Sequence, residues 1–282
     1  MRPRRPGPTV RTRVTELRPG SDGSPTSGDV ERRREDRLIT EEPLELRLEW
    51  PGAAARRVWV TMRTPGHDFE LAAGWVVHEG LAPARDGVTA VAYCTDVALT
   101  PEQDFNVVTV GLAGAPDRLP HQHDALSAGS SACGVCGSDQ VGEALARRAP
   151  AWTGDLPSPD VVRRLPEALR ARQQLFERTG GVHAAALVTA EGELLVVRED
   201  VGRHNAVDKV TGARVLAGLS PAEACLLVSG RVGYELVQKA LAAGIGSLVA
   251  VGAPTSLAVS LAREGGLVLH GFTRPERTVR YT

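Results

Sequence analysis

The sequence predicts an α/β protein with an α+β unit near its N-terminus and a mixed sheet with helices on both faces in its C-terminal part. From residue 184 onward, short apolar runs alternate with segments of helical periodicity, which is typical of a mixed, mostly parallel sheet covered by helices. Residues 44–62 follow another pattern, in which apolar and polar residues alternate on either side of the turn Pro51-Gly52. This alternation predicts a β-hairpin that belongs to the smaller unit.

The composition limits the class of protein. The chain has 282 residues, a net charge of −1 and 42% hydrophobic residues, as expected of a soluble protein of one or two domains. This balanced charge does not indicate nucleic-acid binding or a membrane surface. The sequence has neither an apolar run of about 20 residues for a transmembrane helix nor the apolar h-region of a secretory signal. Four cysteines, two of them isolated, do not form a disulfide framework, and a cytoplasmic location is expected.

The N-terminal third divides into a tail and a small unit. Residues 1–38 are rich in Arg, Pro, Gly, Ser and Asp, and bury too little apolar surface to offset conformational entropy, so we expect a disordered tail. Residues 40–115 are expected to form the α+β unit. After its hairpin, apolar residues recur at helical spacing over 69–77, and strands are predicted at 88–93 and 105–110.

Residues 116–137 are predicted to form a polar loop that carries Cys133 and Cys136. The helical pattern that follows places both thiols just ahead of a helix N-terminus, where the helix dipole favours the reactive thiolate. Two thiols at this spacing serve as half of a zinc site, as a dithiol/disulfide couple, or as a sulfur carrier that holds a persulfide. A zinc site would need two more ligands, for which His121 and His123 are the candidates. The residues by themselves leave these chemistries open, together with a purely structural turn, because the C-x-x-C pattern is only moderately specific.

Residues 138–282 are expected to form the α/β domain. A hairpin turn at Glu191-Gly192 is followed by helices and strands in regular alternation. The predicted order is helix 204–217, strand 224–229, helix 232–243, strand 247–252, helix 255–263 and strand 267–272.

The turns that follow the strands of this domain share one chemistry. They combine Gly with Ser, Thr or Arg, and they occupy residues 199–204, 229–231, 252–256 and 271–277. Ligands of such sheets bind where strands end, and glycine backbone, hydroxyls, helix N-termini and arginines suit phosphate. We therefore expect one large phosphate-bearing ligand at a single edge of the sheet. The sequence contains no Walker lysine loop and no G-x-G-x-x-G fingerprint, so nucleotide hydrolysis and dinucleotide redox chemistry are not supported.

Four segments of the chain resemble the FdhD family, the formate dehydrogenase accessory sulfurtransferases. They are Cys133–Gly137, Gly181–Ala186, Glu199–Lys209 and Gly271–Pro275, and the resemblance covers about residues 40–282. The run Glu-Asp-Val-Gly-Arg-His at the start of the third segment, with a C-x-x-C pair upstream, is highly specific.

The resemblance implies a chaperone-like sulfurtransferase in which Cys133 carries a persulfide and Cys136 is its partner thiol. Sulfur would pass from a cysteine desulfurase to the bis-MGD molybdenum cofactor, which is bound as a substrate and mimicked by GDP. The cofactor would then enter formate dehydrogenase. The C-terminal part would be cytidine-deaminase-like. A homodimer is compatible with the sequence, and neither a metal, a nucleic acid nor a membrane is implied.

The residues expected to bind the cofactor lie in three of the turns. Those from the first two turns are Arg203, His204, Ser229 and Arg231. The resemblance adds the C-terminal segment Phe272, Thr273, Arg274, Pro275, Glu276 and Arg277. Some relatives have cysteine where Thr273 stands. His204 is also a candidate proton donor or acceptor, because the reference pKa of histidine lies near neutrality.

Two other functions compete with sulfur transfer. Deaminases with the implied fold use H-x-E followed by P-C-x-x-C around zinc. Here Ala132 precedes the cysteines in place of the proline, and His183-Ala184-Ala185 follows them and lacks the glutamate. Hydrolytic deamination is therefore not supported. A zinc-stabilised, non-catalytic binding module remains the alternative, and metal analysis of the purified protein would distinguish it.

Overall fold

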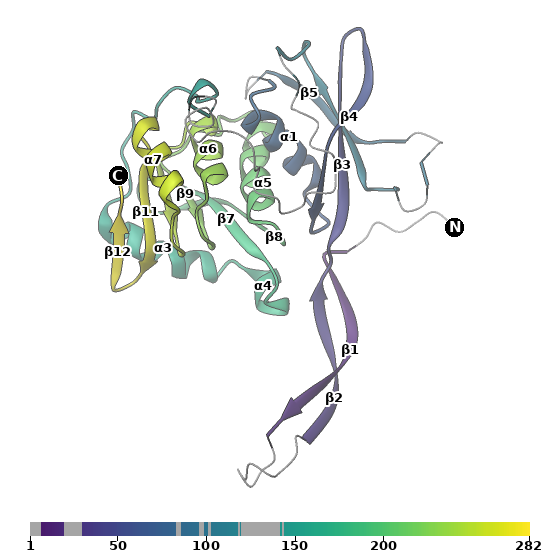
Figure 1. Cartoon of the computed structure of the whole chain (residues 1–282), viewed down its shortest axis with the longest axis vertical. Helices are drawn as coiled ribbons and strands as arrows, with labels where there is room; N and C mark the ends of the chain where they lie inside the picture. Colours follow the sequence, from purple (N-terminus) through teal and green to yellow (C-terminus); the bar gives the residue numbers. More distant parts are fainter. Residues whose placement is uncertain are drawn as a thin grey trace.

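The structure is a computed structural model that describes residues 7–19, 30–82, 86–95, 99–100, 103–117, 119, 142 and 144–282. In these parts of the chain the strands form a two-stranded ribbon, a four-stranded sheet and a six-stranded sheet (Figure 1). The two larger sheets and the helices form the body of the molecule, and the ribbon projects from it.

The four-stranded sheet has the order β4-β3-β6-β5. Its strands are β3 (Glu42–Trp50), β4 (Ala53–Arg63), β5 (Val88–Tyr93) and β6 (Val107–Leu112). Strict alternation along β3 places Leu44, Leu46 and Leu48 on the face that packs against helix α1 (Asp68–His78). The hairpin, the helix and the two further strands predicted for this unit are confirmed.

The six-stranded sheet has the order β12-β11-β10-β9-β7-β8. Its strands are β7 (His183–Val188), β8 (Leu194–Asp200), β9 (Cys225–Val228), β10 (Ser247–Ala250), β11 (Val268–Arg274) and β12 (Arg277–Arg280). The pairs β9–β10 and β10–β11 are parallel, and the other pairs are antiparallel. The prediction of a mixed sheet is confirmed. The expectation that it would be mostly parallel was wrong, because antiparallel hairpins form both of its edges.

Helices cover both faces of this sheet, as predicted. One face carries α5 (Arg203–Leu216), α6 (Tyr234–Ala243) and α7 (Ser256–Gly265), and the other carries α3 (Pro159–Arg170). The short α4 (Gln174–Thr179) precedes β7. Ser158 caps the start of helix α3, because its hydroxyl accepts a hydrogen bond from the Val161 backbone N–H at 3.3 Å.

Helix α1 lies between the two larger sheets and connects them (Figure 1). One side packs on the four-stranded sheet, and the other side packs on α5. Gly74 of α1 and Gly212 of α5 lie in this helix contact, where a Cβ on either residue would overlap the backbone of the facing helix. The two glycines therefore set how closely the small unit approaches the larger one.

The structure contradicts the predicted disordered tail over residues 1–38 in the parts of it that are described. Strands β1 (Thr9–Arg18) and β2 (Val30–Ile39) pair antiparallel along their full length. Low apolar content misleads here because two strands can form backbone hydrogen bonds with each other without burying a core. Its charges also pair between strands, as Arg11 does with Glu35 at 3.3 Å. The other predicted domain boundaries stay predictions.

A buried group of three ionisable side chains connects α1, α5 and α6. Asp208 Oδ1 lies 2.6 Å from Lys239 Nζ and 2.6 Å from His78 Nδ1. Burial lowers the pKa of His78, so its imidazole is neutral at pH 7. Burial acts to raise the pKa of Asp208, but the charge of Lys239 and the hydrogen bond with His78 lower it overall. This buried group of three therefore holds one carboxylate paired with one ammonium group, beside a neutral imidazole.

The low pKa of His78 predicts a loss of stability in mild acid. The unfolded histidine takes up a proton as the pH falls below 6.5, whereas the folded one stays neutral, so folding becomes less favourable. Between pH 7.5 and 5.5 the wild type should lose roughly 1 kcal/mol more unfolding free energy than His78→Gln. Urea unfolding at both pH values measures this difference. Equal losses in the two proteins would contradict the prediction.

Candidate functional site

The strand directions bring the four predicted turns to one edge of the six-stranded sheet. Strands β9, β10 and β11 are parallel, so their carboxyl ends share an edge. Strand β8 runs in the same direction, because it is antiparallel to β7, which is antiparallel to β9. The register places His183, the first residue of β7, opposite Asp200, the last residue of β8. We call this the carboxyl edge.

Backbone contacts hold three of the turns against one another. The Gly252 N–H donates to the Gly230 carbonyl oxygen at 3.1 Å, and the Phe272 N–H donates to the Gly252 carbonyl oxygen at 3.0 Å. A Cβ on Gly252 would lie 2.8 Å from the Gly230 carbonyl oxygen, and a Cβ on Gly271 would lie 2.8 Å from Pro254 Cδ. Glycine is therefore required at these positions for the turns to approach so closely.

The turn after β8 is organised by the buried carboxylate of Asp200. Its Oδ1 accepts hydrogen bonds from the Gly202 N–H at 2.8 Å and from Asn205 Nδ2 at 3.0 Å. Its Oδ2 accepts from Lys209 Nζ at 2.6 Å and from the Thr64 N–H at 3.1 Å. Asp200 and Lys209 are both buried. These four hydrogen bonds fix the geometry of the turn and connect it to the segment that leads into α1.

Arg203 and His204 lie at the other side of this turn and are partly exposed at the carboxyl edge. His204 Nε2 lies 2.9 Å from Glu235 Oε2 of helix α6, and the hydrogen bond from His204 lowers the pKa of Glu235. His183 is also partly exposed, and its imidazole lies beside Gly230 and Arg203. Burial lowers the pKa of His183, and the charges of Arg203 and His204 lower it further.

His183 is a functional candidate that the sequence does not single out, although it lies in one of the four segments that carry the family resemblance. The strand register explains its place, because β7 begins at the edge where β8 and β9 end. A neutral imidazole beside the Arg203 guanidinium can accept a proton or a hydrogen bond from a ligand.

The C-terminal segment Phe272–Arg277 closes one side of the carboxyl edge. Phe272 adopts a left-handed backbone with φ of 51° and exposes 39% of its surface, and the Arg277 guanidinium lies 5.7 Å from its ring centroid. Arg274 Nη1 donates to the Val251 carbonyl oxygen at 2.9 Å. Thr273 is buried, and its hydroxyl lies 3.0 Å from that of Thr278. The Thr273 side chain is therefore covered by protein and is not accessible to a ligand in this structure, whereas the other predicted residues of this segment are exposed.

The remaining predicted residues of the edge have different environments. The Ser229 hydroxyl accepts a hydrogen bond from the Ala184 N–H at 2.9 Å, so it joins β9 to β7. Arg231 is exposed. Its guanidinium is thus available to a ligand.

Cys133 and Cys136 lie outside the described residues, as do His121 and His123. The described residues that follow pack against the body of the molecule. Ala144 packs in the core beside α5 and α6, and Arg147 forms an ion pair with Glu79 at 3.1 Å, just beyond the end of α1.

Among the residues that the structure describes, no cluster of three or more His, Cys, Asp and Glu side chains is arranged to hold a metal ion. No helix among them is both long and apolar enough to cross a bilayer.

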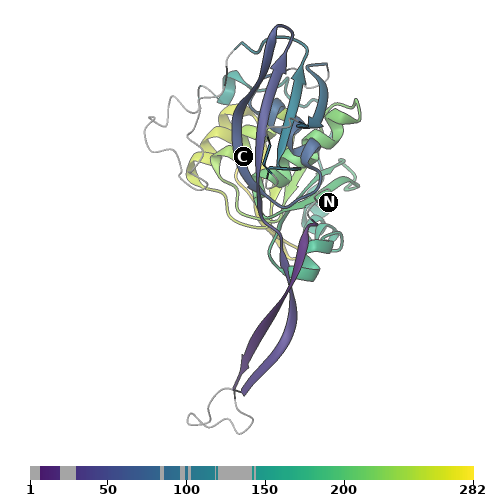
Figure 2. The same ribbon diagram turned by 90° about the vertical axis from the view of Figure 1, so that its right-hand side faces the viewer.

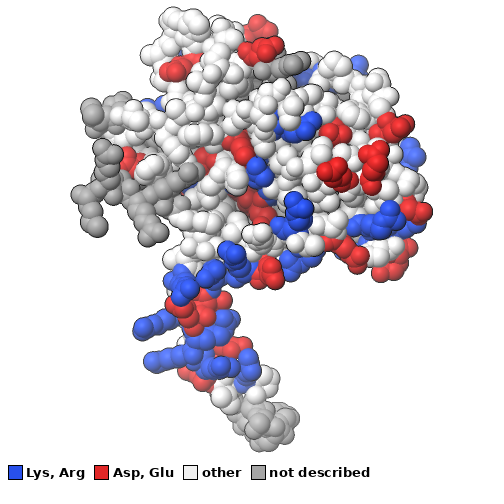
Figure 3. All heavy atoms as spheres, turned by 180° about the vertical axis from the view of Figure 1, so that it is seen from behind, with Lys and Arg blue, Asp and Glu red and all other residues white. Residues whose placement is uncertain are grey.

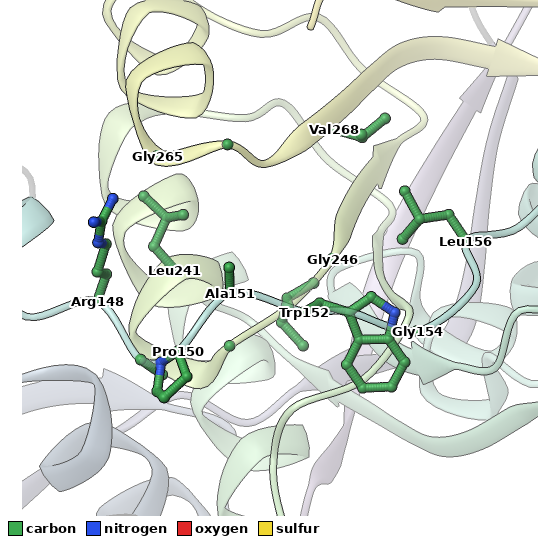
Figure 4. A pocket seen from close by; sticks show the side chains of 14 residues that line it. Arg148, Pro150, Ala151, Trp152, Gly154, Leu156, Leu241, Gly246, Gly265 and Val268 are labelled. Atoms are coloured by element: carbon green, nitrogen blue, oxygen red, sulfur yellow. The ribbon is translucent and has the colours of Figure 1, made fainter.

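A cavity of about 460 Å³ lies at the opposite edge of the six-stranded sheet (Figure 4). Gly246 and Val268, at the amino ends of β10 and β11, line it together with Trp152 and Leu241. Its walls are mostly apolar side chains and glycines, with Arg148 at one side. This cavity is therefore separate from the carboxyl edge and lacks the cluster of arginines and hydroxyls expected for a phosphate-bearing ligand.

The Asp200 carboxylate should be essential for folding. Asp200→Asn leaves the buried ammonium of Lys209 without its counter-charge, and we expect the unfolding free energy to fall by about 3–5 kcal/mol. Chemical denaturation measures this change. Asp160→Asn is the matched control, because Asp160 pairs with Arg163 at an exposed position and its loss should cost less than about 1 kcal/mol. Similar small effects of both substitutions would contradict the assigned role of Asp200.

Similarity to known proteins extends over nearly the whole chain. The model of the FdhD/NarQ family matches residues 39–282. A protein of Streptomyces avermitilis named sulfur carrier protein FdhD is 44% identical over 275 residues, which cover 94% of this chain and 91% of the relative. A protein of the same name from Mycolicibacterium paratuberculosis is 44% identical over 277 residues, which cover 97% of each chain.

A solved structure shows the same fold. It is the crystal structure of a protein from Desulfotalea psychrophila described as a candidate formate dehydrogenase accessory protein. The TM-score is 0.74 at 23% sequence identity, and the match covers 98% of this chain and 97% of the other. Together with the family match over residues 39–282, the similarity to the two relatives shows that this chain belongs to the FdhD/NarQ family.

Proposed function

We propose that this protein is a sulfur carrier that acts in the maturation of formate dehydrogenase. The main support is its 44% identity, over almost the full chain, to relatives named sulfur carrier protein FdhD. The carboxyl edge adds a site with the chemistry that a phosphate-bearing substrate requires. The C-x-x-C pair supplies thiols of the kind that carry sulfur.

In the proposed reaction, the Cys133 thiolate attacks the outer sulfur of a persulfide held by a cysteine desulfurase. A new S–S bond forms on Cys133, the S–S bond of the donor breaks, and the donor cysteine leaves as a thiolate. The electron count is conserved, so neither an oxidant nor a reductant is consumed. For release, we propose that the Cys136 thiolate attacks the Cys133 sulfur: a Cys133–Cys136 disulfide forms, the bond to the outer sulfur breaks, and that sulfur leaves as sulfide to the acceptor, so the two cysteines supply its two electrons.

The proposed acceptor is the bis-MGD molybdenum cofactor, bound as a substrate at the carboxyl edge. Arg203, Arg231 and Arg277 lie partly or fully exposed there and can pair with its phosphates. Phe272 presents an exposed ring on which a guanine base can stack. His183 and His204 are available to donate or accept a proton. GDP carries the guanine and two phosphates, and is therefore the simplest mimic.

Several other features belong to the same proposal. The donor is a cysteine desulfurase and the final recipient is formate dehydrogenase, both in the cytoplasm. The C-terminal part is proposed to have a cytidine-deaminase-like fold, and the protein is proposed to act as a homodimer. The zinc-stabilised binding module is the alternative that the following experiment separates.

Incubation with a cysteine desulfurase and cysteine should add about 32 Da, the mass of one sulfur atom, to Cys133. Intact-protein mass spectrometry and peptide mapping measure the adduct. It should be absent from Cys133→Ala and present on Cys136→Ala.

Cys225→Ala is the matched control, because burial raises the pKa of the Cys225 thiol to about 12 and leaves it unreactive. This variant should take up sulfur like the wild type. An adduct that persists on Cys133→Ala would overturn the assignment of Cys133. A wild type without the adduct, but with one zinc ion that Cys133→Ala loses, would favour the binding module.

A further inference from the structure

Glu235 is an acidic residue of the carboxyl edge that the proposed function leaves without a role. It lies in the first turn of α6, and its Oε2 is 2.9 Å from His204 Nε2 at the start of α5. Both helices belong to the body and lie away from the projecting ribbon of β1 and β2 in two perpendicular views (Figures 1 and 2). The charges of the ribbon are therefore not partners of this pair.

Neither stability nor phosphate binding explains the position of the Glu235 carboxylate. On the face of the body that Figure 3 shows, acidic and basic side chains lie close together, so an ion pair at the surface is by itself ordinary. The Glu235 side chain is 63% exposed and that of His204 is 31% exposed, and such exposed pairs contribute little to folding. A carboxylate also repels the phosphates for which Arg203 and Arg231 are available. The contact with His204 therefore needs another explanation.

This contact is one of two that join α5 to α6. His204 and Asp208 stand four residues apart on α5, so they lie on one side of that helix. Glu235 and Lys239 have the same spacing on α6. The second contact, of 2.6 Å between Asp208 Oδ1 and Lys239 Nζ, is buried. This buried contact fixes the two helices against each other and so holds Glu235 beside His204.

The surroundings keep the Glu235 carboxylate ionised. The hydrogen bond from His204 lowers the pKa of Glu235, burial opposes this effect, and the charges of His204, Lys239 and Arg203 lower the pKa further. An ionised carboxylate can only accept hydrogen bonds, so the neutral imidazole of His204 carries its proton on Nε2. Its Nδ1 is then the ring nitrogen with a free lone pair for a ligand at the carboxyl edge.

We infer that Glu235 is a positioning residue that holds His204 as the proton acceptor in sulfur transfer. The inference rests on the proposed function and adds a step to it. When the Cys136 thiolate displaces the outer sulfur of the Cys133 persulfide, that sulfur leaves with its proton as HS⁻. As the sulfur bonds to the acceptor, the proton passes to His204 Nδ1, and the electron pair of the S–H bond stays on sulfur. The imidazolium keeps its Nε2–H on the Glu235 carboxylate, which stabilises it until Nδ1 releases the proton to water.

The tautomer of His204 tests this inference in the absence of sulfur and cofactor. Long-range proton–nitrogen correlation spectra at about pH 8.5, where an ordinary imidazole is neutral, distinguish Nε2–H from Nδ1–H. His204→Gln assigns the signal. The wild type should show Nε2–H alone, whereas Glu235→Ala should show a share of Nδ1–H. Glu264→Ala is the matched control, because Glu264 is an exposed acidic residue of α7, and it should resemble the wild type.

The rate of sulfur release tests the same inference by function. Protein that carries the persulfide is mixed with bis-MGD, and mass spectrometry follows the loss of the adduct. Glu235→Ala should release sulfur about tenfold more slowly, or slower still, with unchanged GDP affinity and unchanged sulfur uptake on Cys133. Glu264→Ala should release sulfur like the wild type. In the His204→Gln background, Glu235→Ala should slow release no further, because Glu235 acts through His204.

The outcomes separate this inference from the sulfur-carrier proposal. A wild type that takes up no sulfur on Cys133 would overturn the proposed function, and the inference would fall with it. Normal uptake with a wild-type release rate in Glu235→Ala would overturn the inference alone. A weakened GDP affinity of this variant would do so too, because Glu235 would then act in binding. If Glu235→Ala fails to fold by circular dichroism, the wild-type tautomer decides, and Nδ1–H there would contradict the inference.

Discussion

The buried ion pair between Asp200 and Lys209 is the contact on which both halves of the molecule depend, namely the small unit with the four-stranded sheet and the larger part with the six-stranded sheet. Lys209 Nζ also donates to the Thr64 carbonyl oxygen at 3.0 Å, and Asp200 accepts from the Thr64 N–H. The preceding residue, Arg63, is buried and pairs with Asp68 at 3.0 Å in the small unit. One short segment thus joins two buried ion pairs, one in each half. Removal of either partner leaves an unpaired charge in the interior, which costs several kcal/mol.

This constraint explains the arrangement of the carboxyl edge. Asp200 and Lys209 point inward and fix the turn after β8, so Arg203 and His204 remain on the accessible side. Close glycine contacts then bring the next turns beside them, and His183 joins them from β7. The proposed ligand site is therefore rigid where its turns meet the core, and it is polar where a ligand would bind.

Local patterns were sufficient to predict most elements of the body and the four turns at one edge. Parallel strands impose that common edge, and it follows from strand order without knowledge of side-chain contacts. Long-range register was not predictable, which is why His183 was missed and β12 was not foreseen. The pairing of Arg63 with Asp68 was missed as well, since sequence does not show which charges are buried. The ribbon of β1 and β2 was missed because charged residues, consecutive over most of β2, stand where a strand prediction needs alternating apolar ones.

Hydrogen-exchange mass spectrometry with and without GDP tests the central claim that the carboxyl edge binds the nucleotide portion of the substrate. The account predicts slower exchange in residues 229–231, 252–256 and 271–277 when GDP is bound. Exchange around Trp152, in the cavity at the opposite edge, should not change. GDP binding that protects the Trp152 cavity and leaves the three turns unchanged would contradict the account.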